Sequence, residues 1–191
     1  MNKFLLLFFL SILFFSCELF SQNKTQQEEG RIISLLIDEL AMPLPVPPPP
    51  PKDGTPAKKI NIDSLEKVKV RLIVDTTMFQ VKINHNLPEG YNKYKSLKNE
   101  LKKLPEKSIN KDLIESKKGH HLIFGASLDD YVGKYSQMVT FSRISFNSEF
   151  NKAVLLAGHK THERAGFMNL YLLRKENGKW KIIYKKNVEV S

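Results

Sequence analysis

The residue with the clearest chemistry is Cys17, the only cysteine of the 191-residue chain. It follows an apolar run over residues 4–15, which only Ser11 interrupts, and Lys3 is the one charged residue before that run. A short basic start, an apolar middle and a small residue before the cut are the layout of a secretory signal. A helix that crosses a bilayer needs about 20 apolar residues, so this run is too short for a permanent span. Residues 1–16 are therefore expected to be a signal peptide.

The residues before Cys17, namely Phe14, Phe15 and Ser16, resemble a bacterial lipobox, although Leu is commoner at the position of Phe14. This resemblance implies that the Cys17 thiol receives a diacylglyceryl group and that Cys17 becomes the acylated first residue. The alternative is ordinary cleavage with a free thiol, but such sites have small residues at both −3 and −1, and Phe14 is large. We therefore expect lipidation at Cys17 and a lipid-anchored protein of the cell envelope. Its place is the outer face of the cytoplasmic membrane or the outer membrane.

Three further side chains have the right types to hold a metal ion, because His159, His162 and Glu163 lie within five residues. Their spacing is not the helical His-Glu-x-x-His arrangement. The segment is expected to be a strand end and a turn, where consecutive side chains rarely point at one centre. His120 and His121 would add imidazoles only if the fold brings them close. The favoured interpretation is an exposed polar loop without a metal, and the alternative is an envelope hydrolase with a metal site around this loop.

The remaining candidates for chemistry are more simply structural. Ser142 and Ser145 flank Arg143, but no Gly-x-Ser-x-Gly elbow accompanies them. Arg143 is expected to form a structural salt bridge, the pair Asp129-Asp130 a turn, and Trp180 part of the core. We therefore expect no catalytic residue, no metal and no cofactor.

The charge of the chain limits its partners. The formal net charge is +10, and the mature chain would carry +9, because Lys3 is the only charged residue of the leader. The sequence has no RNA-binding aromatic motif, no zinc-finger spacing and no phosphate-binding glycine loop, so nucleic acid is not expected as a partner. Outside the cell, an anionic envelope polymer, lipid head groups or an envelope protein are the partners to consider. A lysine-rich solvated surface that binds nothing specific is the simpler interpretation.

Residues 17–59 are expected to be a tether in three parts. Residues 18–29 are polar and should not fold alone. Residues 30–41 carry a broad stripe of Leu and Ile, which predicts a short amphipathic helix. Packing on the protein's own domain is favoured over docking on a membrane or a partner, because interfacial helices carry more Lys and Arg. Residues 43–51 contain seven prolines and predict a stiff polyproline linker of roughly 28 Å, rather than a peptide ligand.

The folded part is expected to cover residues 60–191. Alternating and helical patterns predict a strand at 68–74, a helix at 91–104, a helical turn within 109–116 capped by Ser108 or Asn110, and a short strand at 120–124. Four strand-like runs follow, at 138–146, 153–159, 166–174 and 179–190. The Asn177-Gly178 pair between the last two is a strong hairpin signal.

These patterns predict an α+β fold. It consists of a C-terminal four-stranded antiparallel meander covered by one or two helices, preceded by the signal peptide and the Pro-rich stalk. One face of the sheet is expected to bury an apolar set made of Leu170, Leu172, Trp180, Ile182 and Tyr184.

The sequences SRISFN at 142–147 and YLLRKENGKWKI at 171–182 carry a resemblance. They are similar to the C-terminal sheet of a group of uncharacterised exported lipoproteins from Bacteroidetes-type bacteria. The resemblance covers roughly residues 135–190 and implies fold and location but no activity. Some of these proteins have a Cys/Gly-rich loop where this chain has residues 158–166, which contain no cysteine.

Overall fold

The computed structural model describes residues 3–41, 68–82, 86–125, 137–162 and 165–190; for residues 3–21, 162, 165, 189 and 190 it describes the backbone alone. The fold is α+β. In the described part of the chain the helices are α1 (Lys3–Leu40), η1 (Asn92–Tyr94), α3 (Lys95–Leu101) and η2 (Lys111–Leu113). The strands are β1 (Arg71–Phe79), β2 (Lys107–Ser108), β3 (His121–Phe124), β4 (Gln137–Ser142), β5 (Ser145–Phe146), β6 (Lys152–His162), β7 (Ala165–Glu176) and β8 (Lys179–Val190).

The strands form one eight-stranded sheet with the order β2-β1-β4-β6-β7-β8, in which β3 also pairs with β1 and β5 with β6. Strands β4, β6, β7 and β8 are neighbours in that order, and each is antiparallel to the next. Strand β1 is parallel to both β3 and β4. The sheet is therefore mixed and larger than the expected four-stranded meander, because the strands that precede β4 in the chain join the same sheet.

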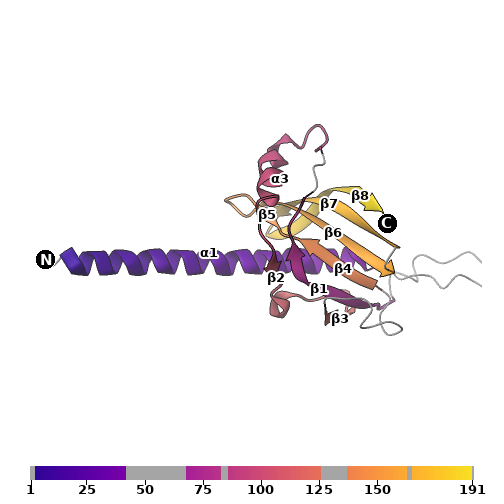
Figure 1. Ribbon diagram of the computed structural model, residues 1–191, viewed down its shortest axis with the longest axis horizontal. Helices are drawn as coiled ribbons and strands as arrows, with labels where there is room; N and C mark the ends of the chain where they lie inside the picture. Colours follow the sequence, from indigo (N-terminus) through magenta and orange to yellow (C-terminus); the bar gives the residue numbers. More distant parts are fainter. Residues whose placement is uncertain (1–2, 42–67, 83–85, 126–136, 163–164, 191) are drawn as a thin grey trace, which may run out of the picture.

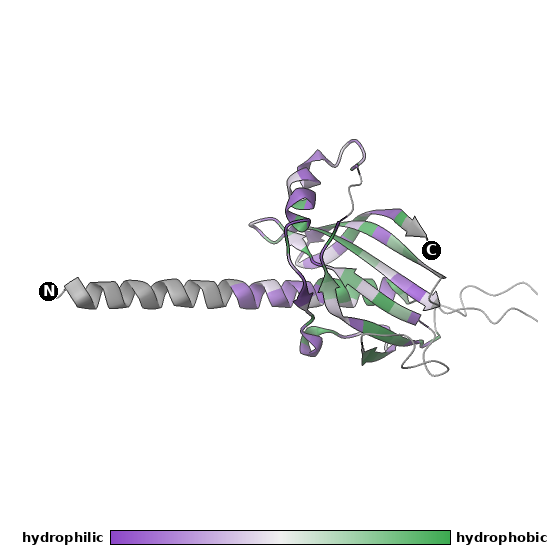
Figure 2. Ribbon diagram, viewed as in Figure 1, coloured by the Kyte–Doolittle hydropathy of each residue, from purple (hydrophilic) through white to green (hydrophobic). Residues whose placement is uncertain are grey.

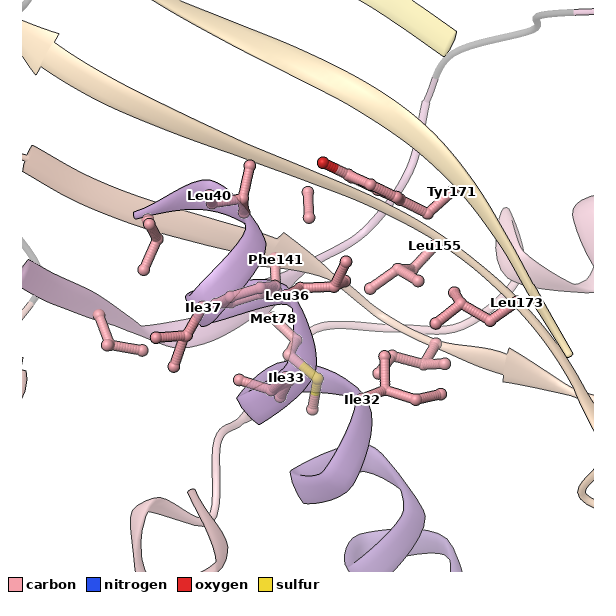
Figure 3. Packing of buried hydrophobic residues seen from close by; sticks show 14 of the residues in the cluster. Ile32, Ile33, Leu36, Ile37, Leu40, Met78, Phe141, Leu155, Tyr171 and Leu173 are labelled. Atoms are coloured by element: carbon pink, nitrogen blue, oxygen red, sulfur yellow. The ribbon is translucent and has the colours of Figure 1, made fainter. Parts of the chain in front are cut away.

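Helix α1 covers one face of this sheet with its C-terminal part (Figure 1). Ile32, Ile33, Leu36, Ile37 and Leu40 are at most 1% exposed. Their cluster includes apolar side chains from β1, β4, β6, β7 and β8. Ile32 and Leu36 point from the helix toward the strands that carry Leu155 and Leu173 (Figure 3). The favoured interpretation, in which residues 30–41 pack on the protein's own domain, is thus confirmed.

The extent of the domain differs from the expected boundary at residue 60. The core already includes α1 from Ile32, and the chain re-enters it at Val70, which is also buried. The apolar stripe of residues 30–41 belongs to the folded domain because the sheet removes it from water. The Pro-rich segment 43–51 lies outside the described residues. It connects Ala41 and Val70, two members of the same core, in sequence.

Gly30 marks the point where another segment crosses α1. A Cβ at this position would lie 2.6 Å from the carbonyl oxygen of Leu113, closer than a side chain allows. The loop of η2 can therefore lie directly on the helix only because residue 30 is glycine. The predicted helical turn in this loop is η2, and Asn110 caps it by accepting a hydrogen bond from the backbone N–H of Asp112.

The opposite face of the sheet is covered by η1 and α3. Tyr94, Leu97 and Leu101 are buried there against Val154, Leu170 and other apolar side chains of β6 and β7. The predicted helix at 91–104 is confirmed in type, as a 3₁₀ turn followed by a shorter α-helix. The domain thus has three layers, with the sheet between α1 and α3.

The hairpin between β7 and β8 is confirmed at Asn177-Gly178, where both residues have positive φ. The prediction that one face buries the whole apolar set of this hairpin is wrong. Trp180 and Ile182 pack with α1, whereas Leu170, Leu172 and Tyr184 pack with α3. The register shifts between the pairs of Leu172 and Leu173. One extra residue in β8 reverses the alternation, so the two halves of the strand present opposite faces.

No helix in the described part of the chain is long and apolar enough to cross a membrane.

Candidate functional site

A groove of about 460 Å³ opens beside the buried half of α1. Three elements build it: α1, the loop that contains η2, and the β7–β8 hairpin. We call it the Trp180 groove; its lining residues are Arg31, Ser34, Leu35, Leu113, Glu115, Lys117, Gly178, Lys179 and Trp180.

One wall of the Trp180 groove is fastened to α1 by side chains of the helix. Ser34 Oγ accepts a hydrogen bond of 3.0 Å from the backbone N–H of Glu115. Asp38 accepts bonds of 2.6 Å from Ser116 Oγ and 3.0 Å from the backbone N–H of Lys117. These bonds hold an otherwise irregular loop against the helix, so the groove has a defined shape.

The other wall is fixed by the buried carboxylate of Glu28. This carboxylate accepts a hydrogen bond of 2.7 Å from Trp180 Nε1. It also forms ion pairs with Lys175 Nζ at 2.6 Å and Arg31 at 2.7 Å. Only 4% of Glu28 is exposed, so these three donors replace its water. Trp180 was expected in the core, and this is confirmed, with its indole N–H directed at Glu28.

The charges at the groove are unequal. Arg31 is paired with Glu28, whereas the ammonium groups of Lys117 and Lys179 have no partner among the described residues. Glu115 is the one acidic lining residue, and Leu35, Leu113 and Trp180 supply apolar surface. No histidine or cysteine of the described chain lines this groove. The arrangement suits binding of a ligand with an anionic and an apolar part.

The pH dependence of stability should report on Glu28. Burial alone would raise its pKa, but the hydrogen bonds from Lys175 and Trp180 and the positive charges of Lys175 and Arg31 outweigh burial and lower the pKa. Its contribution to folding is therefore present above the unfolded glutamate pKa of about 4.3 and is lost as the pH falls through the folded value. Urea unfolding at pH 6 and pH 3.5 should show a larger loss for the wild type than for Glu28→Gln. Equal losses in the two proteins would contradict this origin.

The predicted metal loop is only partly described. His159 lies within β6 and is buried, so the expectation of an exposed loop is wrong for this residue. The rings of His159 and Phe167 are in edge-to-face contact, with their centroids 4.2 Å apart. Burial, together with the positive charge of Lys185, lowers the pKa of His159. The side chain of His162 and all of Glu163 lie outside the described residues. Within the described part of the chain, no three metal-ligating side chains gather.

His120 and His121 lie in different surroundings. His120 is buried, and its Nδ1 accepts a hydrogen bond of 3.2 Å from the backbone N–H of Val70. His121 begins β3, which confirms the predicted short strand, and its side chain is exposed. The hydrogen bond to Val70 gives His120 a structural role at the start of β1.

The serines around Arg143 have structural partners. Ser142 is fully buried; its hydroxyl donates to the carbonyl of Arg143 and accepts from the backbone N–H of Leu156. This hydroxyl joins the end of β4 to β6, so it is not an activated nucleophile. Arg143 donates to the carbonyl of Pro105 and forms no ion pair among the described residues, contrary to the expected salt bridge. Ser145 is buried in β5, and Asp129-Asp130 lies outside the described residues.

Sequence reasoning missed Glu28, which it placed in a polar spacer. Trp180, the partner of Glu28, is 152 residues away in the chain. A buried carboxylate of this kind has no local signature, because nothing in residues 18–29 indicates which side chains will lie against it.

Comparison with known proteins matches this chain to no family model, no curated protein and no solved structure.

Proposed function

We propose that this protein is a lipid-anchored binding module of the cell envelope, with Cys17 as its acylated first residue. The observation that supports this most is the course of α1. The helix is continuous from Lys3 to Leu40, so it contains Cys17, and its last turns belong to the core. A lipid on Cys17 would therefore hold the domain through a helix rather than through a loose tether.

The length of this connection is short. Glu28 is the first buried residue among the described side chains of α1, and it lies eleven positions after Cys17, which corresponds to about 16 Å of helix. The linkage is stiffer and shorter than the expected polyproline stalk. It keeps the domain next to the membrane in a restricted range of orientations and presents the Trp180 groove at the envelope surface.

Sequence features add to this proposal. The leader, the lone cysteine and the resemblance to exported lipoproteins all favour the envelope, on the outer face of the cytoplasmic membrane or in the outer membrane. Two or three acyl chains would anchor firmly, since each buried methylene contributes about 0.8 kcal/mol. An anionic envelope polymer or an envelope protein is the partner that suits Lys117 and Lys179, and nucleic acid is not.

The intact mass of the protein extracted from its native membrane tests the anchor. We expect the mass of residues 17–191 plus acyl chains, and we expect Cys17→Ser to lack this species and to keep its leader. If the wild type and Cys17→Ser both had the mass of a chain without lipid, the anchored function would be refuted.

A further inference from the structure

We propose that the Trp180 groove binds an acidic peptide segment of an envelope protein, one that carries an apolar side chain among its carboxylates. The inference rests on the proposed function, in which this groove is the binding surface, and it adds the chemistry of the partner. Its basis is the fixed shape of the groove, the basic groups without acidic partners on its walls, and an apolar side chain that the fold leaves exposed.

The shape of the groove is set by the fold itself. Its two walls, the loop of η2 and the β7–β8 hairpin, are distant in sequence, and both are joined to α1. The loop is joined through Ser34 and Asp38, and the hairpin through Glu28. A peptide that enters such a groove does not have to order the walls, so less of the binding free energy is lost.

Basic side chains lie on both walls. Lys117 is exposed on the loop and Lys179 on the hairpin, and the ammonium groups of both lack a partner among the described residues. Arg31 is also basic, and 59% of its side chain is exposed. It shares the carboxylate of Glu28 with Lys175, so that one negative charge faces two positive charges. The excess of positive charge favours a partner with carboxylates.

The groove also has apolar surface. Leu113 is 37% exposed, and among the described residues only Leu113 and Val68 are large apolar side chains with such exposure. Leu35 of α1 lines the same groove and is partly buried. The described stretch of α1 that leads to the sheet is hydrophilic (Figure 2), so the groove begins where the surface of the helix changes from polar to apolar. An apolar side chain of the partner would remove Leu113 from water, which favours binding.

This mixed lining favours a peptide over other anions. A polyanionic polymer would gain nothing from Leu35 and Leu113, and Glu115 would repel it. The acyl chain of a lipid needs a mostly apolar site, whereas only Leu35, Leu113 and Trp180 of the lining are apolar. A peptide supplies carboxylates and an apolar side chain together. The volume of about 460 Å³ is also within the usual range of ligand sites, about 300–1,000 Å³.

The experiment uses the full chain in detergent and the peptide acetyl-Gly-Glu-Leu-Glu-Gly-amide as the probe. One comparison peptide has Ser in place of Leu and so lacks the apolar side chain, and another has Lys in place of both Glu residues. Isothermal titration calorimetry measures the affinity. The indole N–H resonance of Trp180 locates the ligand, because Trp180 lines the groove and is the only tryptophan of the chain.

We expect the Glu-Leu-Glu peptide to bind about tenfold more tightly than either comparison peptide and to shift the Trp180 resonance. Binding should weaken in 0.5 M salt, because salt screens the charges. The double variant Lys117→Glu with Lys179→Glu should lose about tenfold in affinity and should instead prefer the Lys-Leu-Lys peptide. Leu113→Ser should lower the affinity for the Glu-Leu-Glu peptide to that for the Glu-Ser-Glu peptide.

The matched control is Lys69→Glu with Lys186→Glu, which makes the same charge change at exposed positions outside the groove lining. It should keep the preference for the Glu-Leu-Glu peptide. Circular dichroism checks that each variant is folded.

Absence of binding, equal binding of the three peptides, or equal losses in the two double variants would overturn the inference. Polyphosphate or a short-chain phosphatidylglycerol that binds more tightly than the Glu-Leu-Glu peptide would assign the groove to a polymer or a lipid and would also overturn it. Failure of the anchor is a separate result, because the intact mass reports on Cys17, whereas peptide binding in detergent does not need the lipid.

Discussion

A chain that begins at residue 60 is expected not to fold, although all eight strands of the sheet lie after that residue. It lacks Ile32, Ile33, Leu36, Ile37 and Leu40, which are at most 1% exposed in the complete protein. Burial of one such side chain contributes about 1.5–3 kcal/mol, so the five contribute about 7–15 kcal/mol. Domains are stable by only about 5–15 kcal/mol in total. Loss of α1 therefore removes as much free energy as the domain has, and it also exposes the apolar side chains of the sheet that pack in the same cluster as the helix.

The matched control is a chain that begins at Gln22 and keeps the part of α1 whose side chains the structure describes. Urea unfolding followed by circular dichroism should give one cooperative transition for this chain and none for residues 60–191. Within the longer chain, Leu36→Ala should cost about 2–5 kcal/mol, whereas Val68→Ala, at a side chain that is 45% exposed, should cost little. If residues 60–191 unfolded cooperatively at the same urea concentration, α1 would not belong to the core as described.

Substitution of Glu28 by alanine is expected to have the second-largest effect, a loss of about 3 kcal/mol from the free energy of unfolding. The variant leaves Trp180 Nε1 without its acceptor and removes the carboxylate that pairs with Lys175 and Arg31. A buried donor without a partner costs about 1–3 kcal/mol. The loss of the ion pair with Lys175, whose side chain is only 19% exposed, adds to this. Arg31 is largely exposed and contributes little, because water can replace its partner.

The neighbouring position supplies the control. Gln27 precedes Glu28 in the same helix and is exposed, so Gln27→Ala should change stability by less than about 0.5 kcal/mol. Glu28→Gln keeps an acceptor for Trp180 but not the charge, and it should fall between the two. Urea unfolding monitored by Trp180 fluorescence measures all three, since Trp180 is the only tryptophan of the chain. Equal stability of Glu28→Ala and Gln27→Ala would show that this carboxylate does not hold the hairpin to α1.

Both predictions concern the connection that the proposed function needs. If α1 both contains Cys17 and forms part of the core, then the orientation of this helix at the membrane also sets the orientation of the domain. Glu28 lies at the point where the helix enters the domain, and it joins that point to a wall of the Trp180 groove. A substitution that removes the contacts of Glu28 with Trp180 and Lys175 should therefore lower the free energy of unfolding and also change the shape of the Trp180 groove.

Local patterns were sufficient for several elements. The Asn177-Gly178 turn and the helix before Pro105 were predicted correctly, because turn chemistry and periodicity act over a few residues. Residues 30–40 are helical as predicted, but they are the end of a helix that begins at Lys3 and not a separate short helix. The α+β class followed from the same signals. The signal peptide and the lipid on Cys17 stay predictions, since they concern processing and not folding.

Other features depended on the tertiary structure. Periodicity in residues 30–41 indicated an apolar stripe but not what covers it, and the sheet that covers it begins at Arg71, after a long intervening segment. The buried role of Glu28 depends on Lys175 and Trp180, more than 140 residues away, and the two faces of β8 depend on a bulge whose register is set by β7. Sequence by itself thus determined the helical character of residues 30–40 and most of the strands, but not that residues 18–29, which were expected to be a polar tether, belong to the same helix α1. Only the folded chain decided which of these segments meet, because burial free energy belongs to pairs of surfaces that are distant in sequence.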